Sequence, residues 1–355
     1  MEFLTDYGLF LAETVTLVVA IIVVLTAAVS ISHKARQKHE EGEIEVTRLN
    51  DRLKRMHEAV EAKLMEKGER KAWQKLKRKE EKARAKLARK EKKQASRDPE
   101  KRKRLFVIDF DGDIKASANE SLRESITAIM GLAKQERGDE VVVRLESGGG
   151  LVHAYGLAAA QLDRVRQAKL PLTVCVDKVA ASGGYMMACV ADRIVASPFA
   201  VLGSIGVVAQ LPNFHRLLKK HDVDYEVLTA GEYKRTLTVF GENTEKGRRK
   251  FLDDLEDTHG LFKDYVSERR PELDIDAVAN GDIWFGQRAL DVKLVDELMT
   301  SDQYLVDACE SADVLLVKYE HPKSLAERLG VGVSQVTERT VMRLLQSLRD
   351  SRFGG

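Results

Sequence analysis

The feature that most constrains this fold is a regular alternation of short apolar segments and amphipathic segments that begins at Leu105. Segments rich in β-branched residues are followed by segments with helical spacing and by turns that contain glycine. This alternation predicts an α/β fold in which a parallel sheet is layered with helices. The expected strands are 105–110, 140–145, 172–176, 193–197, 206–208 and 225–229, and the expected helices are 122–134, 154–167, 182–191, 213–220 and 244–270.

One apolar stretch inside this region, 185–211, is long enough to resemble a membrane span. Asp192 and Arg193 lie near its middle, and Pro198 and several glycines interrupt it. Charged side chains in the middle of a bilayer are costly. We therefore expect this stretch to be protein core.

The N-terminal segment 1–32 is predicted to be a membrane anchor. Its long apolar run holds one charge, Glu13, and about 20 apolar residues span a bilayer as a helix. A signal peptide would carry basic residues before the run, whereas here Glu2 and Asp6 precede it, so an uncleaved anchor is favoured over a signal peptide. A buried core helix is the alternative. The basic residues Lys34, Arg36 and Lys38 follow the run, and the positive-inside rule places the remainder of the chain in the cytoplasm.

Residues 33–104 form a charged connector, although the formal net charge of the whole chain is only +2. From Lys71 to Arg104 about half of the residues are Lys or Arg. We interpret the connector as a solvated helical spacer, with contact to anionic lipid as the alternative. Trp73 alone interrupts the basic run as a stacking residue, so we expect no nucleic-acid binding. Apolar residues at helical spacing predict an amphipathic helix in the first part of the connector: Leu49, Leu53, Met56, Val60 and Leu64.

The remainder of the chain is divided into a globular domain, 105–312, and a C-terminal extension, 313–355. The chain has 44% hydrophobic residues, enough for an ordinary packed core. In the extension, Val341, Leu344 and Leu348 recur at helical spacing, which predicts an amphipathic helix. Docking of this helix on its own domain or on a partner subunit is favoured, and contact with a membrane surface is the alternative.

Several common kinds of functional site have no support, because the motifs that form them are absent from the sequence. The chain has no GxxxxGK[ST] loop and no complete GxGxxG, so nucleotide binding has no support, and it has no GxSxG elbow. Cys175, Cys189 and Cys309 are far apart and form no CxxC pair, so neither a disulfide framework nor a zinc site is predicted. The apolar surroundings of Cys175 and Cys189 predict buried, reduced thiols. We expect neither a metal nor an organic cofactor.

Two glycine-rich turns carry the strongest functional signal. The first, 146–150, reads Glu-Ser-Gly-Gly-Gly at the end of a predicted strand. Glycines there let backbone N–H groups face a cavity, as an oxyanion hole requires. The second turn, 180–185, reads Ala-Ala-Ser-Gly-Gly-Tyr and enters an apolar helix. Ser182 therefore has two interpretations, a helix N-cap or a nucleophile, and its neighbours in the sequence leave both open.

A nucleophilic serine needs a general base. Lys234 lies in the run Gly-Glu-Tyr-Lys-Arg, 231–235, just after a predicted strand. A buried lysine can serve as a general base, whereas most lysines at such positions are simply exposed. The eight histidines are scattered along the chain, and a Ser-His-Asp triad also stays open because folding brings triad members together.

Four segments, in this order along the chain, resemble hallmark motifs of the signal peptide peptidase SppA family. They are 177–185 (DKVAASGGY), 203–207 (GSIGV), 231–234 (GEYK) and 281–298, which holds FGQRAL and LVDE. The resemblance covers most of the chain. It implies a ClpP/crotonase-like fold built from stacked ββα units, preceded here by the membrane anchor and the charged helical connector.

The resemblance also implies roles for individual residues. It makes Ser182 the nucleophile and Lys234 the general base of a Ser-Lys dyad. It places the oxyanion donors at Gly149 and Gly183, and it implies that Ser204 hydrogen-bonds to the lysine and orients it. This chemistry needs no metal and no organic cofactor.

Two positions depart from the family pattern. Gly148 stands where the family usually has proline, which makes the first turn more flexible. Lys293 replaces a glycine of the closing segment. Neither change removes a residue of the implied catalytic set.

The family further implies where the protein works and with what partners. It implies a homo-oligomeric ring whose active sites are completed by neighbouring subunits. The implied substrates are peptides, namely cleaved signal peptides and other short or unfolded membrane-associated segments. The implied location is the bacterial inner (plasma) membrane, with one span and a periplasmic catalytic domain, in conflict with the cytoplasmic side that the flanking charges favour.

We therefore predict a membrane-anchored serine endopeptidase that hydrolyses peptides through an acyl-enzyme. A crotonase-like acyl-CoA enzyme is one alternative, and it would keep the oxyanion hole without needing the dyad. A non-catalytic membrane scaffold is the other alternative. It would bind partners through the basic connector and oligomerisation, and it would not need Ser182.

Overall fold

The structure, a computed structural model, describes residues 42–66 and 102–320, together with 68–73, 75–77, 79, 82, 83 and 86. It divides into two units. One unit, Val46–Lys318, holds the sheet and the candidate site. The other comprises Met1–Glu45 and Tyr319–Gly355, and among its described residues the Gly42 N–H donates to the Tyr319 hydroxyl at 3.0 Å. The predicted membrane anchor and the predicted C-terminal helix lie outside the described residues.

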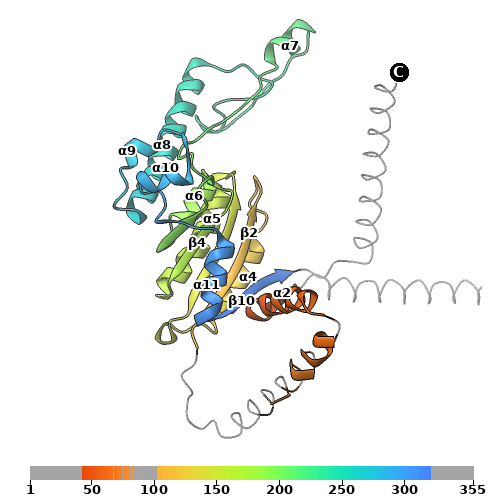
Figure 1. Cartoon of the computed structure of the whole chain (residues 1–355). Coiled ribbons are helices and arrows are strands. Elements are labelled where there is room, and N and C mark those ends of the chain that lie inside the picture. The colour runs from red at the N-terminus through yellow and green to blue at the C-terminus, as the bar shows by residue number, and fades with distance from the viewer. Residues whose placement is uncertain are drawn as a thin grey trace, which may run out of the picture. The chain divides into compact units, whose positions relative to one another are not determined.

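A largely parallel sheet forms the centre of the fold (Figure 1). The described strands are β1 (Glu43–Arg48), β2 (Arg104–Gly112), β3 (Glu140–Ser147), β4 (Leu172–Val176), β5 (Val179–Ala181), β6 (Arg193–Ala196), β7 (Val201–Gly203), β8 (Ile283–Phe285), β9 (Glu297–Leu298) and β10 (Asp313–Glu320). Their order is β1-β10-β2-β3-β4-β6-β9, while β5 pairs with β3 and β7, and β7 pairs with β8. The pairs from β10 to β9 are parallel, and β7 and β8 are antiparallel.

Helices cover both faces of this sheet, because parallel neighbours need crossover connections. The described helices are α2 (Leu49–Leu64), α4 (Asn119–Met130), the 3₁₀ turn η1 (Gln135–Arg137), α5 (Val152–Gln167), α6 (Gly183–Ala188), α7 (His215–Lys220), α8 (Glu245–Arg269), α9 (Ile275–Val278), α10 (Gly286–Asp291) and α11 (Ser301–Ser311). Residues of α4, α5 and α6 belong to the larger core cluster, and residues of α2 and α11 belong to the smaller one.

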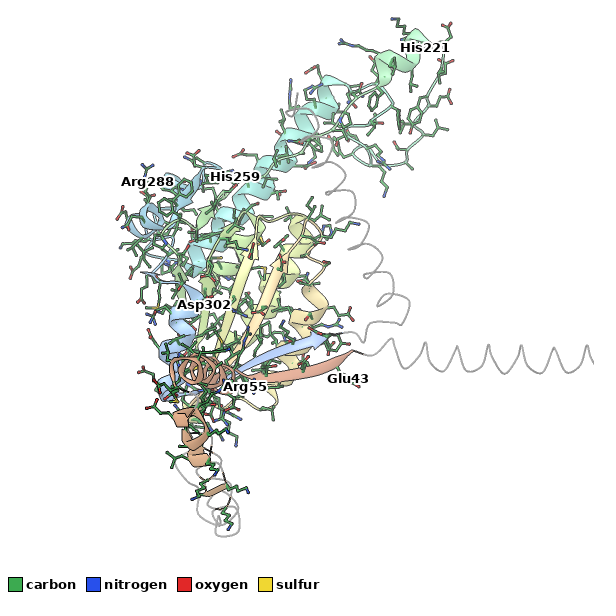
Figure 2. All side chains as sticks on the ribbon, turned by 45° about the vertical axis from the view of Figure 1, so that its right-hand side comes forward. Glu43, Arg55, His221, His259, Arg288 and Asp302 are labelled. Atoms are coloured by element: carbon green, nitrogen blue, oxygen red, sulfur yellow. The ribbon has the colours of Figure 1, made fainter. Side chains whose placement is uncertain are left out.

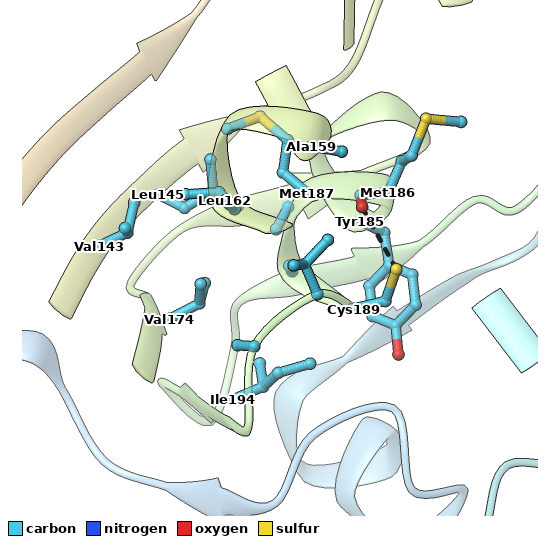
Figure 3. Packing of buried hydrophobic residues seen from close by; sticks show 14 of the residues in the cluster. Val143, Leu145, Ala159, Leu162, Val174, Tyr185, Met186, Met187, Cys189 and Ile194 are labelled. Carbon is cyan, nitrogen blue, oxygen red and sulfur yellow. Dashed lines mark hydrogen bonds between the residues drawn. The ribbon is translucent and has the colours of Figure 1, made fainter. Parts of the chain in front are cut away.

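The central strands bury both of their faces, which explains why they read as continuous apolar runs. In β3, Val141, Val143 and Leu145 join the larger cluster, whereas Val142 joins the smaller one. This alternation follows from the two-residue repeat of a strand. Figure 3 shows Val143 and Leu145 beside residues of α5 and α6. The sheet is therefore packed against α5 and α6 on the side that positions the candidate site.

The predicted buried thiols are confirmed. Cys175 and Cys189 are buried and free. The Cys189 thiol, just after the end of α6, donates to the Met186 carbonyl at 3.2 Å (Figure 3). Burial raises the pKa of both Cys175 and Cys189 to about 12. Both thiols are therefore protonated and unreactive at neutral pH.

The α/β class and most of the predicted elements are confirmed, including the amphipathic helix that is now α2. Two predicted strands are wrong, because 206–208 and 225–229 form no strand. The strand near the first of them is β7, which ends at Gly203. In the second segment Leu228 is 89% exposed, and no described strand pairs with it. Strand propensity alone does not form a strand where no neighbour is available.

The apolar stretch 185–211 is core as far as Ile205, as predicted. Its residues build α6, β6 and β7, and most of those before Gly206 are buried. Beyond Ile205 the prediction is wrong, because Val208 and Leu211 are exposed. The helix within it, α6, has only six residues. In the described part of the chain, no helix combines the length and the apolar character that crossing a membrane requires.

Between β7 and α8 the chain forms a projection that we call the arm, 206–244. Figure 1 shows α7 at the far end of the arm, and Figure 2 shows His221 there. Many of its apolar side chains are exposed, among them Val208, Leu217 and Leu228. A series of exposed apolar side chains along one segment is typical of a protein–protein contact surface.

Candidate active site

Ser182 lies at the junction between β5 and α6. Its φ of 51° and ψ of −119° lie outside the regions that L-residues usually occupy. Its backbone N–H donates to the Gly203 carbonyl at 2.8 Å, and its side chain makes no capping hydrogen bond to α6. The N-cap interpretation of Ser182 is therefore not supported. Strained backbone of this kind clusters at functional sites, where the surrounding structure holds a side chain in place.

The first glycine turn lies directly beside Ser182. β3 and β5 pair in parallel with Ser147 opposite Ala180, so the turns that follow both strands are neighbours. A Cβ atom on Gly149 would lie 2.8 Å from the Ser182 Cβ and 2.6 Å from the Gly183 nitrogen. Gly149 also has a φ of +86°. Both the conformation and the space therefore require glycine at this position.

Backbone N–H groups converge on this junction. Gly183 is the first residue of α6, so its N–H has no acceptor within the helix. The Gly149 N–H donates to the Ser147 Oγ at 3.1 Å, so an oxyanion would have to share or replace that bond. Gly150, the next residue of the turn, lines the cavity beside Ser182. The structure thus brings Gly149 and Gly183 together, although one of the two N–H groups already has an acceptor.

Sheet register brings Ser204 to the same place. Ala181 of β5 is paired with Gly203 of β7, so Ser182 and Ser204 follow neighbouring strand ends. Ser204 has a φ of 50°, its N–H donates to the Asp282 carbonyl at 2.7 Å, and it is partly buried.

A largely apolar cavity of about 270 Å³ opens beside Ser182. Its walls come from three helices and from the first residues of the arm. They include Val152 and Gly156 of α5, Met186 of α6, Leu261, Phe262 and Tyr265 of α8, and Gly206, Val207 and Val208 of the arm. The size and apolar lining suit a hydrophobic side chain of a ligand. A ligand group bound here would lie within reach of the serine, because Ser182 itself lines the cavity.

An ionic contact fixes the α8 wall of this cavity. Arg269 donates to the Asp163 carboxylate at 2.8 Å, and the Tyr265 hydroxyl donates to the same carboxylate at 3.3 Å. The Arg269 guanidinium also lies 3.5 Å from the centroid of the Tyr265 ring. Burial raises the pKa of Tyr265, so its hydroxyl stays protonated. These contacts join α8 to α5 and preform the cavity, whereas the sequence had indicated only a long charged helix.

Lys234 lies elsewhere in the chain. It is exposed in the arm, between α7 and α8, where its backbone N–H donates to the Gly231 carbonyl at 3.2 Å. It is not among the described residues that line the cavity beside Ser182. The structure therefore brings together Ser182, Gly149, Gly183 and Ser204, and it leaves Lys234 on the arm.

The described residues also bear on metal binding. Nowhere in residues 42–66 and 102–320, or in the described positions between them, do three or more His, Cys, Asp or Glu side chains form a group that could hold a metal ion.

Comparison with known proteins decides the family. The model of the N-terminal region of peptidase family S49 matches residues 2–162, and the peptidase family S49 model matches residues 164–315. The chain belongs to peptidase family S49. This result confirms the resemblance to the SppA family, which is the same S49 family, and it supports a peptidase function.

Relatives of this S49 chain share its sequence over nearly its full length. "Probable protease SohB" of Haemophilus influenzae is 52% identical over 330 residues, which cover 93% of this chain and 92% of that protein. "Probable protease SohB" of Buchnera aphidicola subsp. Acyrthosiphon pisum is 47% identical over 344 residues, which cover 97% and 98%. A solved structure of a mutant 1510-N membrane-bound stomatin-specific protease with a substrate peptide covers 67% of this chain and 99% of its own, with 14% identity and a TM-score of 0.40.

Proposed function

We propose that this S49 chain is a serine endopeptidase with a Ser-Lys dyad, in which Ser182 is the nucleophile and Lys234 the general base. One observation carries the proposal. Ser182 is held in a strained conformation where two glycine turns meet, and it lines an apolar cavity. A serine at such a junction has access both to a bound peptide and to backbone N–H donors.

The proposed reaction is amide hydrolysis through an acyl-enzyme. The neutral Nζ of Lys234 takes the proton of the Ser182 hydroxyl, and the serine oxygen attacks the peptide carbonyl carbon. The lysinium ion then protonates the leaving amine. Water that is activated by the same lysine attacks the ester and releases the acyl group, which regenerates the serine.

Backbone N–H groups would stabilise the tetrahedral intermediate. The Gly183 N–H has no acceptor within α6 and is the first proposed donor. Gly149 provides the second proposed donor, which would turn from the Ser147 Oγ toward the oxyanion or be shared between them. Ser204 would accept or donate a hydrogen bond at Lys234 and orient its amine toward Ser182.

Lys234 would reach Ser182 from a second copy of the chain. Its position on the exposed arm, among exposed apolar side chains such as Leu228 and Tyr233, supports this arrangement. Burial of those side chains against a neighbour would contribute to assembly. The protein is therefore proposed to be a homo-oligomer whose active sites are completed between copies.

The cavity beside Ser182 supports peptides as substrates. An apolar cavity walled by α5, α6, α8 and the start of the arm suits the hydrophobic side chains of signal-peptide remnants and of other short or unfolded membrane-associated segments. Such segments are extended, so their carbonyl groups are accessible to the serine.

The proposed setting is a bacterial inner membrane. The proposed division of the chain is an anchor at 1–32, a charged connector at 33–104, a ClpP/crotonase-like peptidase domain at 105–312 and an extension at 313–355. The pairing of β10 with β2 adds the first part of the extension to the sheet of that domain. A reporter fused to the C-terminus tests on which side of the membrane the peptidase domain lies. We expect reporter activity in the periplasm.

Hydrolysis of a fluorogenic signal-peptide-like substrate by the full-length protein in detergent or membranes tests this function. We expect Ser182→Ala and Lys234→Ala each to lower kcat/KM by about 10³-fold or more. Lys246→Ala is the matched control, because it removes an exposed lysine that pairs with Glu232 at the surface. A serine-acylating phosphonate probe should label the wild type and not Ser182→Ala.

Other outcomes separate the alternatives. If Lys234→Ala is fully active while Ser182→Ala is inactive, the proposed dyad is wrong and another residue acts as the general base. Absence of both cleavage and labelling in the wild type would favour the crotonase-like enzyme or the scaffold.

A further inference from the structure

A series of hydrogen bonds connects the first glycine turn, 146–150, to the buried residue Tyr155 of α5. The Tyr155 hydroxyl lies 2.7 Å from the Asp113 carbonyl oxygen and 2.5 Å from the Ser147 Oγ. The Ser147 Oγ in turn accepts the Gly149 N–H at 3.1 Å. Tyr155 is completely buried and Ser147 nearly so. These hydrogen bonds therefore link the buried side of α5 to the glycine turn that touches Ser182.

The direction of each bond in this series follows from its end groups. A carbonyl oxygen can only accept, so the single hydroxyl proton of Tyr155 goes to Asp113. The Ser147 hydroxyl then has two acceptors in reach, the Tyr155 oxygen at 2.5 Å and the Gly112 carbonyl oxygen at 3.4 Å, and we assign its proton to the closer one. Its lone pairs remain available to accept the Gly149 N–H. Bonds that all point the same way polarise and strengthen one another. Burial raises the pKa of Tyr155, so its hydroxyl remains a donor at neutral pH.

The ring of the same tyrosine packs against the second glycine turn. A Cβ atom on Gly183 would collide with the Tyr155 ring and would lie 2.8 Å from the Tyr155 Cβ. The hydroxyl end also fills its space closely, because a Cβ on Gly112 would lie 2.6 Å from the hydroxyl oxygen. Tyr155 is thus in contact with Gly183 through its ring and with Gly149 through Ser147.

The first turn needs such external support. Residues 148–150 are three consecutive glycines, so no side chain of the turn restricts its backbone. Glycine loses more conformational freedom on ordering than any other residue. The hydrogen bond to the Ser147 Oγ is a fixed contact of this turn, and the Tyr155 hydroxyl holds that oxygen in place.

We propose that Tyr155 is a positioning residue that sets the two halves of the oxyanion site relative to each other. Its ring fixes Gly183 and its hydroxyl fixes the Gly149 turn through Ser147. This inference rests on the proposed peptidase function. A displacement of about 1 Å of such donors lowers the rate by up to roughly 100-fold.

The test compares Tyr155→Phe with Tyr304→Phe in the full-length protein. Tyr304 of α11 also bonds to a hydroxyl and an oxygen acceptor, Thr173 and Glu140, but on the other side of the sheet. We expect Tyr155→Phe to lower kcat by about 10- to 100-fold with KM unchanged. Tyr304→Phe should keep the wild-type kcat. The two variants should have similar thermal midpoints, so a general loss of stability would not explain the difference.

A transition-state analogue gives a readout that a merely structural role would not move. A peptide aldehyde forms a tetrahedral adduct with the serine, whereas the corresponding peptide alcohol only fills the cavity. In Tyr155→Phe the aldehyde should lose affinity by the same factor as kcat/KM, while the alcohol keeps its affinity. An unchanged or raised kcat, or equal losses for aldehyde and alcohol, overturns the proposal.

Ser147→Ala keeps the test decisive if Tyr155→Phe does not fold. It removes the acceptor of the Gly149 N–H, and it should show the same fall in kcat at constant KM. Where both variants fold, the double variant should fall no further than Ser147→Ala, because the hydroxyl acts through Ser147. If the losses of kcat in the two single variants add in the double variant, the Tyr155 hydroxyl does not act through Ser147. A wild type that does not cleave peptides would instead reject the proposed function itself.

Discussion

At the scale of single residues, the candidate site is built from backbone conformations that most residues avoid. Ser182 and Ser204 have φ values of 51° and 50°, and Gly149 and Gly203 have 86° and 85°. A non-glycine residue in such a conformation costs about 1–3 kcal/mol and persists only where its surroundings enforce it. Here the enforcing contacts are the pairing of β5 with β3 and β7 and the burial of α6.

The requirement for glycine at Gly149 can be separated from backbone strain. Gly138 is the matched control, since its φ is +72° but a Cβ there would meet nothing within 4 Å. Gly138→Ala should lower the free energy of unfolding by about 1–2 kcal/mol and leave activity unchanged. Gly149→Ala should also push against Ser182 and Gly183 and lower kcat/KM by about 100-fold or more. Equal activity of the two variants would contradict this account of Gly149.

At the scale of elements, a buried carboxylate ties the starts of two strands together. Asp139 is fully buried just before β3. It accepts the Arg104 backbone N–H at 3.1 Å, the Arg104 guanidinium at 2.5 Å and the Lys134 N–H at 2.9 Å. Burial by itself would raise the pKa of Asp139, but these hydrogen bonds and the Arg104 charge outweigh it and lower the pKa. The carboxylate is therefore more stable in the folded protein than in the unfolded chain.

A stability difference that depends on pH follows from this lowered pKa. The contribution of Asp139 is present above its unfolded pKa of about 3.9 and is lost as the pH falls through the lower folded pKa. At pH 7, Asp139→Asn should lower the free energy of unfolding by about 2–4 kcal/mol, because it leaves the Arg104 charge poorly paired. Urea titrations at pH 7 and at pH 3 should show that the difference in the free energy of unfolding between the wild type and Asp139→Asn is smaller at pH 3.

The control for Asp139 is Asp253→Asn, an exposed carboxylate of α8. It should have almost no effect at either pH. A wild-type advantage over Asp139→Asn that is as large at pH 3 as at pH 7 would show that packing, and not the charge, is responsible.

At the scale of the whole molecule, the separation of Ser182 from Lys234 is the feature that matters most. The sheet positions the serine, whereas the arm carries the lysine together with exposed apolar residues. A dyad assembled between copies would make activity depend on association, since each copy supplies half of a site.

Mixing two inactive variants tests this arrangement. Ser182→Ala keeps the lysine and Lys234→Ala keeps the serine, so mixed oligomers would contain some complete sites. Refolding or coexpressing the two together should recover activity that neither variant shows alone. Each variant refolded by itself is the control. No recovery in samples shown by tagged pull-down to contain mixed oligomers would contradict a dyad shared between copies.

The sequence by itself determined the class of the fold and its central strands. Short, mostly apolar runs rich in β-branched residues predicted β2, β3, β4 and β6, because a strand buried on both faces is apolar at most positions. It also indicated Ser182 and the two glycine turns as candidates, since glycine marks places where the backbone needs unusual freedom. The strands predicted at 206–208 and 225–229 were wrong, because their pattern says nothing about whether a neighbouring strand exists.

Only the tertiary structure decided how these candidates meet. The pairing of β5 with β3 and β7 places Gly149, Ser182 and Ser204 at adjacent strand ends, and long-range register cannot be inferred from local spacing. The same holds for Tyr155, which in sequence is one more apolar position of a helix. In the structure its ring and hydroxyl reach two turns at once, because burial forces a tyrosine to find its hydrogen-bond partners inside the core.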